Sequence, residues 1–108
     1  MTEMTKRDFN PLGYTHKETI ADGVTGDYIV VPPLGDGTRV SCTVIAGAGT
    51  GKIQFTTSPD SEVIAGTATW QDWPEGNSTG TTSDTLIGPV TALRGVSVSG
   101  EIKIEIVV

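Results

Sequence analysis

The sequence predicts an all-β protein, an antiparallel β-sandwich or small barrel of jelly-roll type with about seven or eight short strands. Of its 108 residues, 37 are Thr, Val or Ile and only 4 are Leu, a composition that favours strands over helices. Over residues 28–108, short runs of alternating apolar and polar residues are separated by Gly, Pro, Asn or Asp about every 8–12 residues. This spacing is typical of sandwiches and small barrels.

The first part of the chain has a different character. Over residues 1–27 charged residues are scattered among isolated apolar ones, Asn10-Pro11 and Leu12-Gly13 interrupt the run, and no helical or strand period is visible. We therefore expect an extended N-terminal arm over residues 1–27, held by a neighbouring chain. A β-module over residues 28–108 should follow it, and no helix is expected in either part.

The module should begin with a strand at residues 28–31, where Pro32-Pro33 ends it and places it at a sheet edge. Residues 39–46 and 52–58 both alternate, and the Gly-rich segment between them predicts a hairpin. Cys42 shares the apolar face of the first of these runs, so we expect it to be buried as a small apolar residue.

The remaining strands are less uniform. Residues 62–70 are expected to form an irregular strand with Gly66 at a bulge. Residues 78–84 are polar, and both a surface loop and a weak edge strand fit them. Residues 90–98, with a bulge at Gly95, and residues 102–108 should form a closing hairpin around Ser99-Gly100.

Charge and composition restrict the function. Seven Lys and Arg against 13 Asp and Glu give a net charge of −6, which argues against a general nucleic-acid-binding surface. No run reaches the roughly 20 apolar residues of a membrane span, and no apolar stretch follows the first basic residues, so no secretory signal is expected. The single Cys fits synthesis in a reducing cytoplasm.

Motifs that carry chemistry are incomplete. Residues 46–53 resemble a phosphate-binding loop, but Ile53 stands where the motif requires Ser or Thr, and a strand follows where a helix must begin. Asn77-Ser78-Thr79 matches a glycosylation signal, which has no use without secretion. His16 has no second His or Cys pair near it to build a metal site. We expect no catalytic residue, no cofactor and no metal.

Two tryptophans, Trp70 and Trp73, flank Gln71-Asp72. On a strand, Trp70 and Asp72 share one face and Trp73 lies on the other. One Trp is therefore expected in the core and the other at the surface or in the turn, and the sequence leaves open which is which. An exposed Trp beside Asp72 and Asn77 would suit a protein or sugar contact.

Residues 65–76 (AGTATWQDWPEG) and 88–94 (GPVTALR), with the closing alternating hairpin, resemble small virion proteins of tailed bacteriophages over residues 28–108. The resemblance implies a β-sandwich or β-barrel accessory module of the capsid or tail, often a decoration (cement) protein present on the shell in many copies. It implies no catalytic residues.

The expected function is therefore that of a non-enzymatic virion structural protein, first of all a head decoration protein that stabilises neighbouring capsid subunits. A tail or fibre component and a carbohydrate-binding or host-attachment module are the alternatives. We expect the major capsid protein or other virion proteins as partners, a homo-oligomer such as a trimer, and neither nucleic acid nor membrane. Aromatic, apolar and basic residues are expected at partner contacts: Arg7, Phe9, Leu12, Tyr14, His16, Tyr28 and Trp73.

Overall fold

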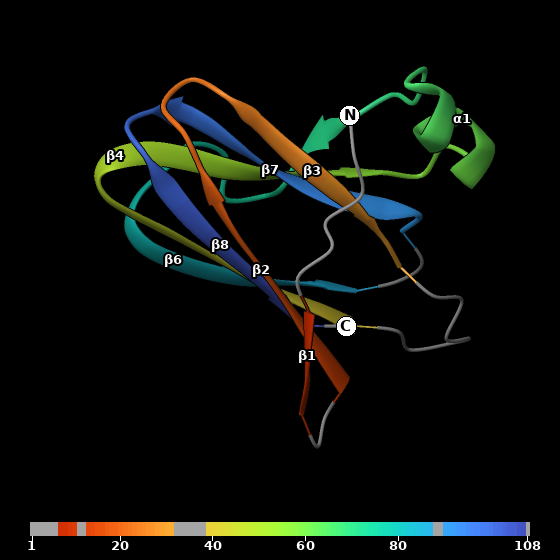
Figure 1. Cartoon of the computed structure of the whole chain (residues 1–108), viewed down its shortest axis with the longest axis horizontal. Coiled ribbons are helices and arrows are strands. Elements are labelled where there is room, and N and C mark those ends of the chain that lie inside the picture. The colour runs from red at the N-terminus through yellow and green to blue at the C-terminus, as the bar shows by residue number, and fades with distance from the viewer. Residues whose placement is uncertain (1–6, 11–12, 32–38, 88–89, 108) are drawn as a thin grey trace.

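The computed structural model describes residues 7–10, 13–31, 39–87 and 90–107 (Figure 1). This part of the chain holds eight strands and one short helix. In chain order they are β1 (Arg7–Asn10), β2 (Gly13–Ile20), β3 (Thr25–Val30), β4 (Arg39–Thr56), α1 (Asp60–Ala65), β5 (Gln71–Asp72), β6 (Ser78–Ile87), β7 (Ala92–Ser99) and β8 (Ile102–Val107). Every described strand pair is antiparallel, so the expected all-β fold of small-barrel type is confirmed.

The strands form one sheet that curls into a nearly closed barrel. Their order is β1-β2-β8-β4-β7-β3, and β5 and β6 also pair with β4. The 18-residue strand β4 takes part in both walls: its first half pairs with β8 and β6, and its second half with β7 and β5. Between the halves β4 bends back on itself at the left of Figure 1, where Gly47 has a positive φ of 57°. A residue without Cβ adopts this conformation at little cost.

The two predicted hairpins are chain reversals whose arms pair with other strands. The first half of β4 pairs with β8, and its second half pairs with β7. The second reversal, at Ser99-Gly100, joins β7 to β8, and both of these strands pair with β4 and not with each other among the described pairs. The predicted strands are confirmed, but the predicted pairing between the two arms of each reversal is wrong. A sheet that curls around a small core carries the two arms of a reversal onto opposite walls.

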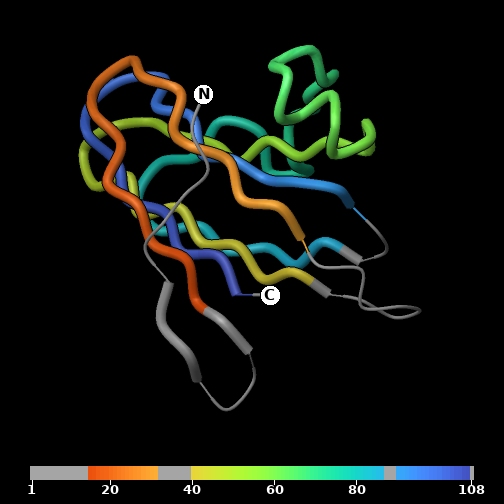
Figure 2. The backbone as a smooth tube through the Cα atoms, turned by 45° about the vertical axis from the view of Figure 1, so that its right-hand side comes forward, coloured from red at the N-terminus to blue at the C-terminus, as the bar shows by residue number. Residues whose placement is uncertain are grey.

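Chain reversals meet at one end of the barrel (Figure 2). The turn between β2 and β3 is tied to the turn between β7 and β8, because Asp22 Oδ1 accepts a hydrogen bond from the Gly100 amide at 2.9 Å. The buried Ser97 adds two bonds: its Oγ accepts from the Gly23 amide at 3.1 Å, and its amide donates to the Val24 carbonyl at 2.9 Å. These bonds fix β2 and β3 relative to β7 and β8.

Alternate residues of the strands fill the barrel. In β8, Ile102, Ile104 and Ile106 are buried while Lys103 is exposed, which confirms the predicted phase. Gly95 pairs in register with Ile53, so the bulge predicted there is wrong. The core is mainly aliphatic, with one Trp and one Cys: Ile20, Ile29, Val31, Val40, Cys42, Val44, Ala46, Ile53, Trp73, Leu86, Leu93, Ile102, Ile104 and Ile106.

The strand predicted over residues 62–70 is wrong, because residues Asp60–Ala65 form α1. Asp60 and Glu62 lie in its first turn, where negative charge stabilises a helix. Gly66 ends it in the left-handed conformation, φ 80°, and its amide donates to the Val63 carbonyl at 3.2 Å. A short apolar run such as Val63-Ile64-Ala65 has no periodicity that separates a strand from a helix.

The extended arm predicted over residues 1–27 is also wrong, because β1, β2 and the start of β3 belong to the sheet. Residues 1–6 and 11–12 of that arm lie outside the described residues. β2 pairs with β8 from Thr15 to Ile20, and β3 begins at Thr25 and pairs with β7. Ile20 is 2% exposed and lies in the main core. Alternation in β2 was hidden because two of its inward positions carry His16 and Glu18 in place of apolar residues.

Candidate functional site

The β1–β2 hairpin extends past the neighbouring strand β8. β2 pairs with β8 from Thr15 onward, whereas Gly13 and Tyr14 pair with β1 alone among the described strands. Figure 1 shows β1 and the start of β2 projecting below the barrel. This overhang is a two-stranded ribbon whose backbone continues the sheet beyond the body, so it is the first candidate for an interaction surface.

Four of the predicted contact residues meet in this hairpin. Phe9 lies opposite Tyr14 in the ladder, and Arg7 lies opposite His16. Residues that face each other across an antiparallel pair share one face of the sheet, so positions 7, 9, 14 and 16 belong to the same face. Leu12 lies outside the described residues.

His16 is 6% exposed and pairs with the fully buried Ile106 of β8. Its position is therefore in the barrel wall, and its predicted role as a surface contact is wrong. The register explains this, because His16 shares the inward face of β2 with Ile20.

Tyr28 and Trp73 are also buried, so neither is the surface contact expected of it. Tyr28 is 7% exposed and lies in a small cluster with Val63 of α1 and Ala92. The helix covers the outer face of β3, and the sequence did not predict that helix. Trp73 is 2% exposed in the main core, and its Nε1 donates to the Gly76 carbonyl at 2.8 Å. β3 remains at one end of the strand order, as its prolines predicted.

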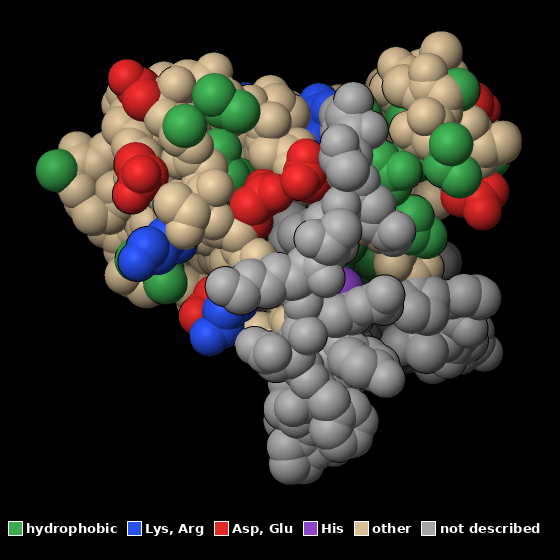
Figure 3. Space-filling model, viewed as in Figure 1, with side chains coloured by type: hydrophobic (Ala, Val, Ile, Leu, Met, Phe, Trp, Pro, Cys, Tyr) green, Lys and Arg blue, Asp and Glu red, His purple; other side chains and the backbone are tan. Residues whose placement is uncertain are grey.

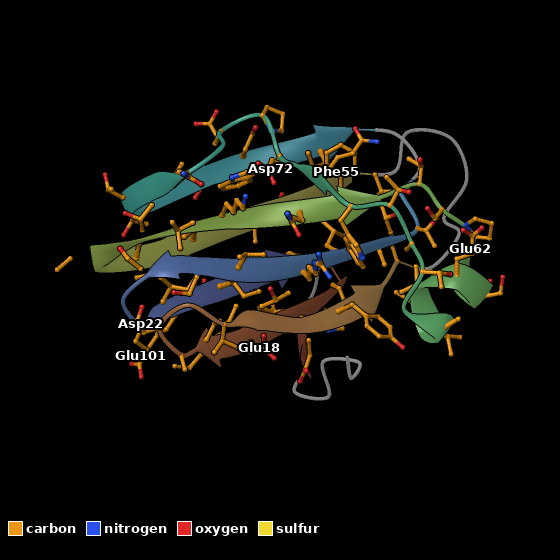
Figure 4. The ribbon with its side chains drawn as sticks, turned by 90° about the horizontal axis from the view of Figure 1, so that it is seen from above. Glu18, Asp22, Phe55, Glu62, Asp72 and Glu101 are labelled. Atoms are coloured by element: carbon orange, nitrogen blue, oxygen red, sulfur yellow. The ribbon has the colours of Figure 1, made fainter. Side chains whose placement is uncertain are left out.

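A row of polar side chains crosses the outer face of β5, β4 and β7, and Figure 4 labels its member on β5, Asp72. Gln54 is its centre: its Nε2 donates to Asp72 Oδ1 at 3.0 Å, and its Oε1 accepts from Arg94 Nε at 2.8 Å. Lys52 also contacts this aspartate: its Nζ forms a salt bridge with Asp72 Oδ1 at 3.0 Å. Hydrogen bonds from Gln54 and Lys52 lower the pKa of Asp72.

Trp70 closes this row, with the Arg94 guanidinium carbon 4.2 Å from its ring centroid. The predicted split between the two tryptophans is confirmed, since Trp70 is half-buried at the surface and Trp73 is in the core. A sugar binds a Trp by stacking on a face of the ring. Arg94 already covers one of the two faces of Trp70, so that face is closed to a sugar. Sequence alternation placed Lys52 and Gln54 together, but Arg94 joins them only through the β4–β7 register.

The side chain of Glu18, a residue of β2, reaches toward β3. The two strands are joined by a turn but are not neighbours in the strand order. Its two carboxylate oxygens accept from the Asp27 amide at 3.1 and 3.3 Å. Burial raises the pKa of Glu18 to about 7, the hydrogen bond from the Asp27 amide opposes this, and the negative charge of Asp27 adds to it. Nothing in the residue order places Glu18 beside Asp27, so this group could not be predicted from the sequence.

Cys42 is 1% exposed, which confirms the prediction of a buried small residue. Burial raises the pKa of its thiol to about 12, and the nearby charge of Asp84 contributes. At neutral pH the sulfur is therefore a thiol, whereas nucleophilic attack needs the thiolate. Within the described residues, no three His, Cys, Asp or Glu side chains are grouped as metal ligands.

Residues 46–53 all lie within β4, where the chain bends, so the local structure is the strand and turn that the sequence predicted there and not a phosphate loop before a helix. A shallow groove of about 420 Å³ follows this bend and the neighbouring β7–β8 turn. None of the helices in the described ranges has the length and apolar character to span a membrane.

Comparison with known proteins gave no match to a family model, to a curated protein or to a solved structure.

Proposed function

We propose that this chain is a non-enzymatic structural protein of a virion, most directly a head decoration protein that binds the capsid surface and stabilises neighbouring subunits. The observation that carries the proposal is the β1–β2 hairpin, which extends past β8 and is attached to a compact barrel. A barrel with a projecting ribbon suits a part that attaches by protein contact.

Backbone pairing is the interaction that this ribbon offers. β1 is the last strand at its end of the order, and its outer edge pairs with no other described strand. Such an edge presents N–H and C=O groups to which an extended segment of a partner adds as a further strand. Phe9 and Tyr14, opposite each other in the ladder, are of the residue type that often provides most of the energy at protein interfaces.

Many copies on a shell would make weak contacts sufficient. A specific interface buries on the order of 800 Å² per partner, and a ribbon of this size offers only part of that area. Repetition on a symmetric surface raises the effective affinity through avidity. The chain's net charge of −6 further predicts that the binding surface of the capsid carries complementary basic residues.

The test is cosedimentation of the full chain with capsids of the phage that encodes it, followed by electron microscopy of the loaded particles. We expect saturable binding at symmetric positions on the head. The double variant Phe9→Ser/Tyr14→Ser should bind at least about tenfold more weakly, because an aromatic hot spot contributes about 1–2 kcal/mol or more.

The matched control is Ile64→Ser. Ile64 is an apolar side chain, 68% exposed on α1, and α1 lies at the far side of the barrel from the hairpin (Figure 1). This variant should bind as the unchanged protein does. Equal binding by the hairpin variant and the unchanged protein would refute the hairpin as the attachment site. Density along the tail would favour the tail or fibre alternative. Absence of the protein from the particle would refute the virion proposal.

A further inference from the structure

A break in the strand ladder lies between β2 and β3. The two strands leave the turn at residues 21–24 and then pair with different neighbours, β2 with β8 and β3 with β7. We call residues 17–20 of β2 and 25–28 of β3 the β2–β3 seam. Within it, the Glu18 carboxyl group accepts two hydrogen bonds from the Asp27 amide, so one side chain takes the place of a backbone ladder.

The seam depends on an irregularity in β3. Thr25 pairs with Val96 and Tyr28 pairs with Arg94, so three steps along β3 match two along β7, and the register shifts between them. A bulge of this kind turns one amide out of the ladder. The Asp27 amide donates to Glu18 of β2, which gives the displaced N–H the acceptor that it needs.

Space for the carboxyl group is provided by Gly26. A Cβ at this position would contact Glu18 Oε1 and would lie 2.8 Å from Ile20 Cδ1. Any larger residue would push Glu18 out of the seam or displace Ile20 from the core. The seam is therefore built around the Glu18 side chain, which is half-buried and so retains a path to solvent.

We propose that Glu18 is a pH-sensitive latch: in its protonated form it joins β2 to β3, and on ionisation it withdraws toward solvent and the seam loosens. Protonated Glu18 can donate to the Asp27 side chain, a hydrogen bond that raises the pKa of Glu18, while it also accepts from the Asp27 amide. Once Glu18 is ionised, its charge and that of Asp27 repel each other across the seam.

Burial and the charge of Asp27 favour the neutral form of Glu18, and the hydrogen bond from the Asp27 amide opposes them. From β3 it faces Asp27, and from β8 it faces the buried Ile104. On the inward face of β2 it has His16 and Ile20 as neighbours, and Arg7 of β1 lies opposite His16 in the ladder. Other charges border the same strands from the outer face: Lys17, Lys103 and Glu105, with Lys17 Nζ 3.6 Å from Glu105 Oε1. The hydrogen-bond donor at the carboxyl is thus the Asp27 amide, and the nearest opposing charge is that of the Asp27 side chain.

The direction of the pH effect follows from linkage. Burial, together with the charge of Asp27, raises the pKa of Glu18 to about 7 from its ordinary value of 4.5. A carboxyl group whose pKa is raised by folding contributes stability that is complete below pH 4.5 and is lost as the pH rises through 7. The seam should therefore be tightest in mild acid and loosest in mild base.

Two measurements on the full chain test this. The side-chain carboxyl carbon of Glu18, followed by NMR, should titrate with a midpoint near 7, and Asp27→Asn should lower that midpoint. The hydrogen-exchange protection factor of the Asp27 amide should fall about tenfold between pH 6 and pH 8.5, a modest change because a half-exposed carboxyl is partly screened by solvent.

The variant Glu18→Gln is a neutral mimic of the closed latch, and its Asp27 protection factor should not change over this pH range. Glu105→Gln is the matched control, since it removes an acid from the neighbouring strand outside the seam, and it should retain the change seen in the unchanged protein. A Glu18 midpoint near 4.5, or equal protection of the Asp27 amide at both pH values in the unchanged protein, would overturn the proposal even if Glu18→Gln does not fold.

Discussion

Arg94 of β7 stacks its guanidinium over the ring of Trp70, with 4.2 Å between the guanidinium carbon and the ring centroid. The same side chain donates to Gln54 through Nε. Trp70 belongs to the segment after α1, so this arginine adds to the contacts that attach that segment to the sheet, among them the hydrogen bond from Thr56 Oγ1 to the Thr69 carbonyl. Figure 3, in which side chains are coloured by type, shows α1 as the lobe at the upper right.

We predict that Arg94→Ala lowers the free energy of unfolding by about 1–2 kcal/mol, through the lost stacking and the lost hydrogen bond to Gln54. Trp70→Ala should cost a similar amount. In a double-mutant cycle by denaturant unfolding, the two residues should show a coupling of about 0.5–1 kcal/mol. Additive effects would show that the stacked contact contributes nothing to stability.

Removal of residues 1–26 should unfold the protein, because it deletes β2 and the buried Ile20. Removal of residues 1–10, which deletes β1 and no other described strand, should leave the barrel folded, since β2 still pairs with β8. Circular dichroism and thermal melting separate the two truncations. A folded protein lacking residues 1–26 would show that β2 is dispensable for the fold.

Ile104→Asp should prevent folding, because Ile104 is fully buried and an unpaired buried charge costs several kcal/mol. The adjacent substitution Lys103→Asp is the control, since Lys103 faces outward on the same strand, and it should change stability by less than about 1 kcal/mol. Loss of the folded near-UV spectrum in the second variant and not in the first would mean that the strand phase is inverted.

The thiol of Cys42 should react with a disulfide reagent at pH 8 only as fast as the protein opens. Burial raises its pKa to about 12, and the thiolate is the reactive form. In denaturant, where the ordinary pKa of a thiol returns, the reaction should be faster by at least about a hundredfold. A fast reaction of the folded protein would contradict the buried position.

Residue order alone determined the fold class and the strands whose two faces differ. In β8, three isoleucines alternate with charged residues, and only a strand with one face in the core gives that pattern. The buried state of Cys42 followed from the same rule. Alternation did not reveal β2, because two of its inward positions are polar. It did not distinguish α1 from a strand either, because a short apolar run has no periodicity.

Tertiary structure decided which segments meet, because contact between distant residues depends on strand register and not on neighbouring residue types. Side-chain packing brought the helix over Tyr28, whereas register placed Phe9 opposite Tyr14 and set Arg94 beside Gln54 in the polar row. It also placed Glu18 beside Asp27, where a bulge in β3 and the absence of a Cβ at Gly26 make room for a carboxyl group. Sequence patterns fix the face on which a residue lies, whereas the curl of the sheet fixes what that face meets.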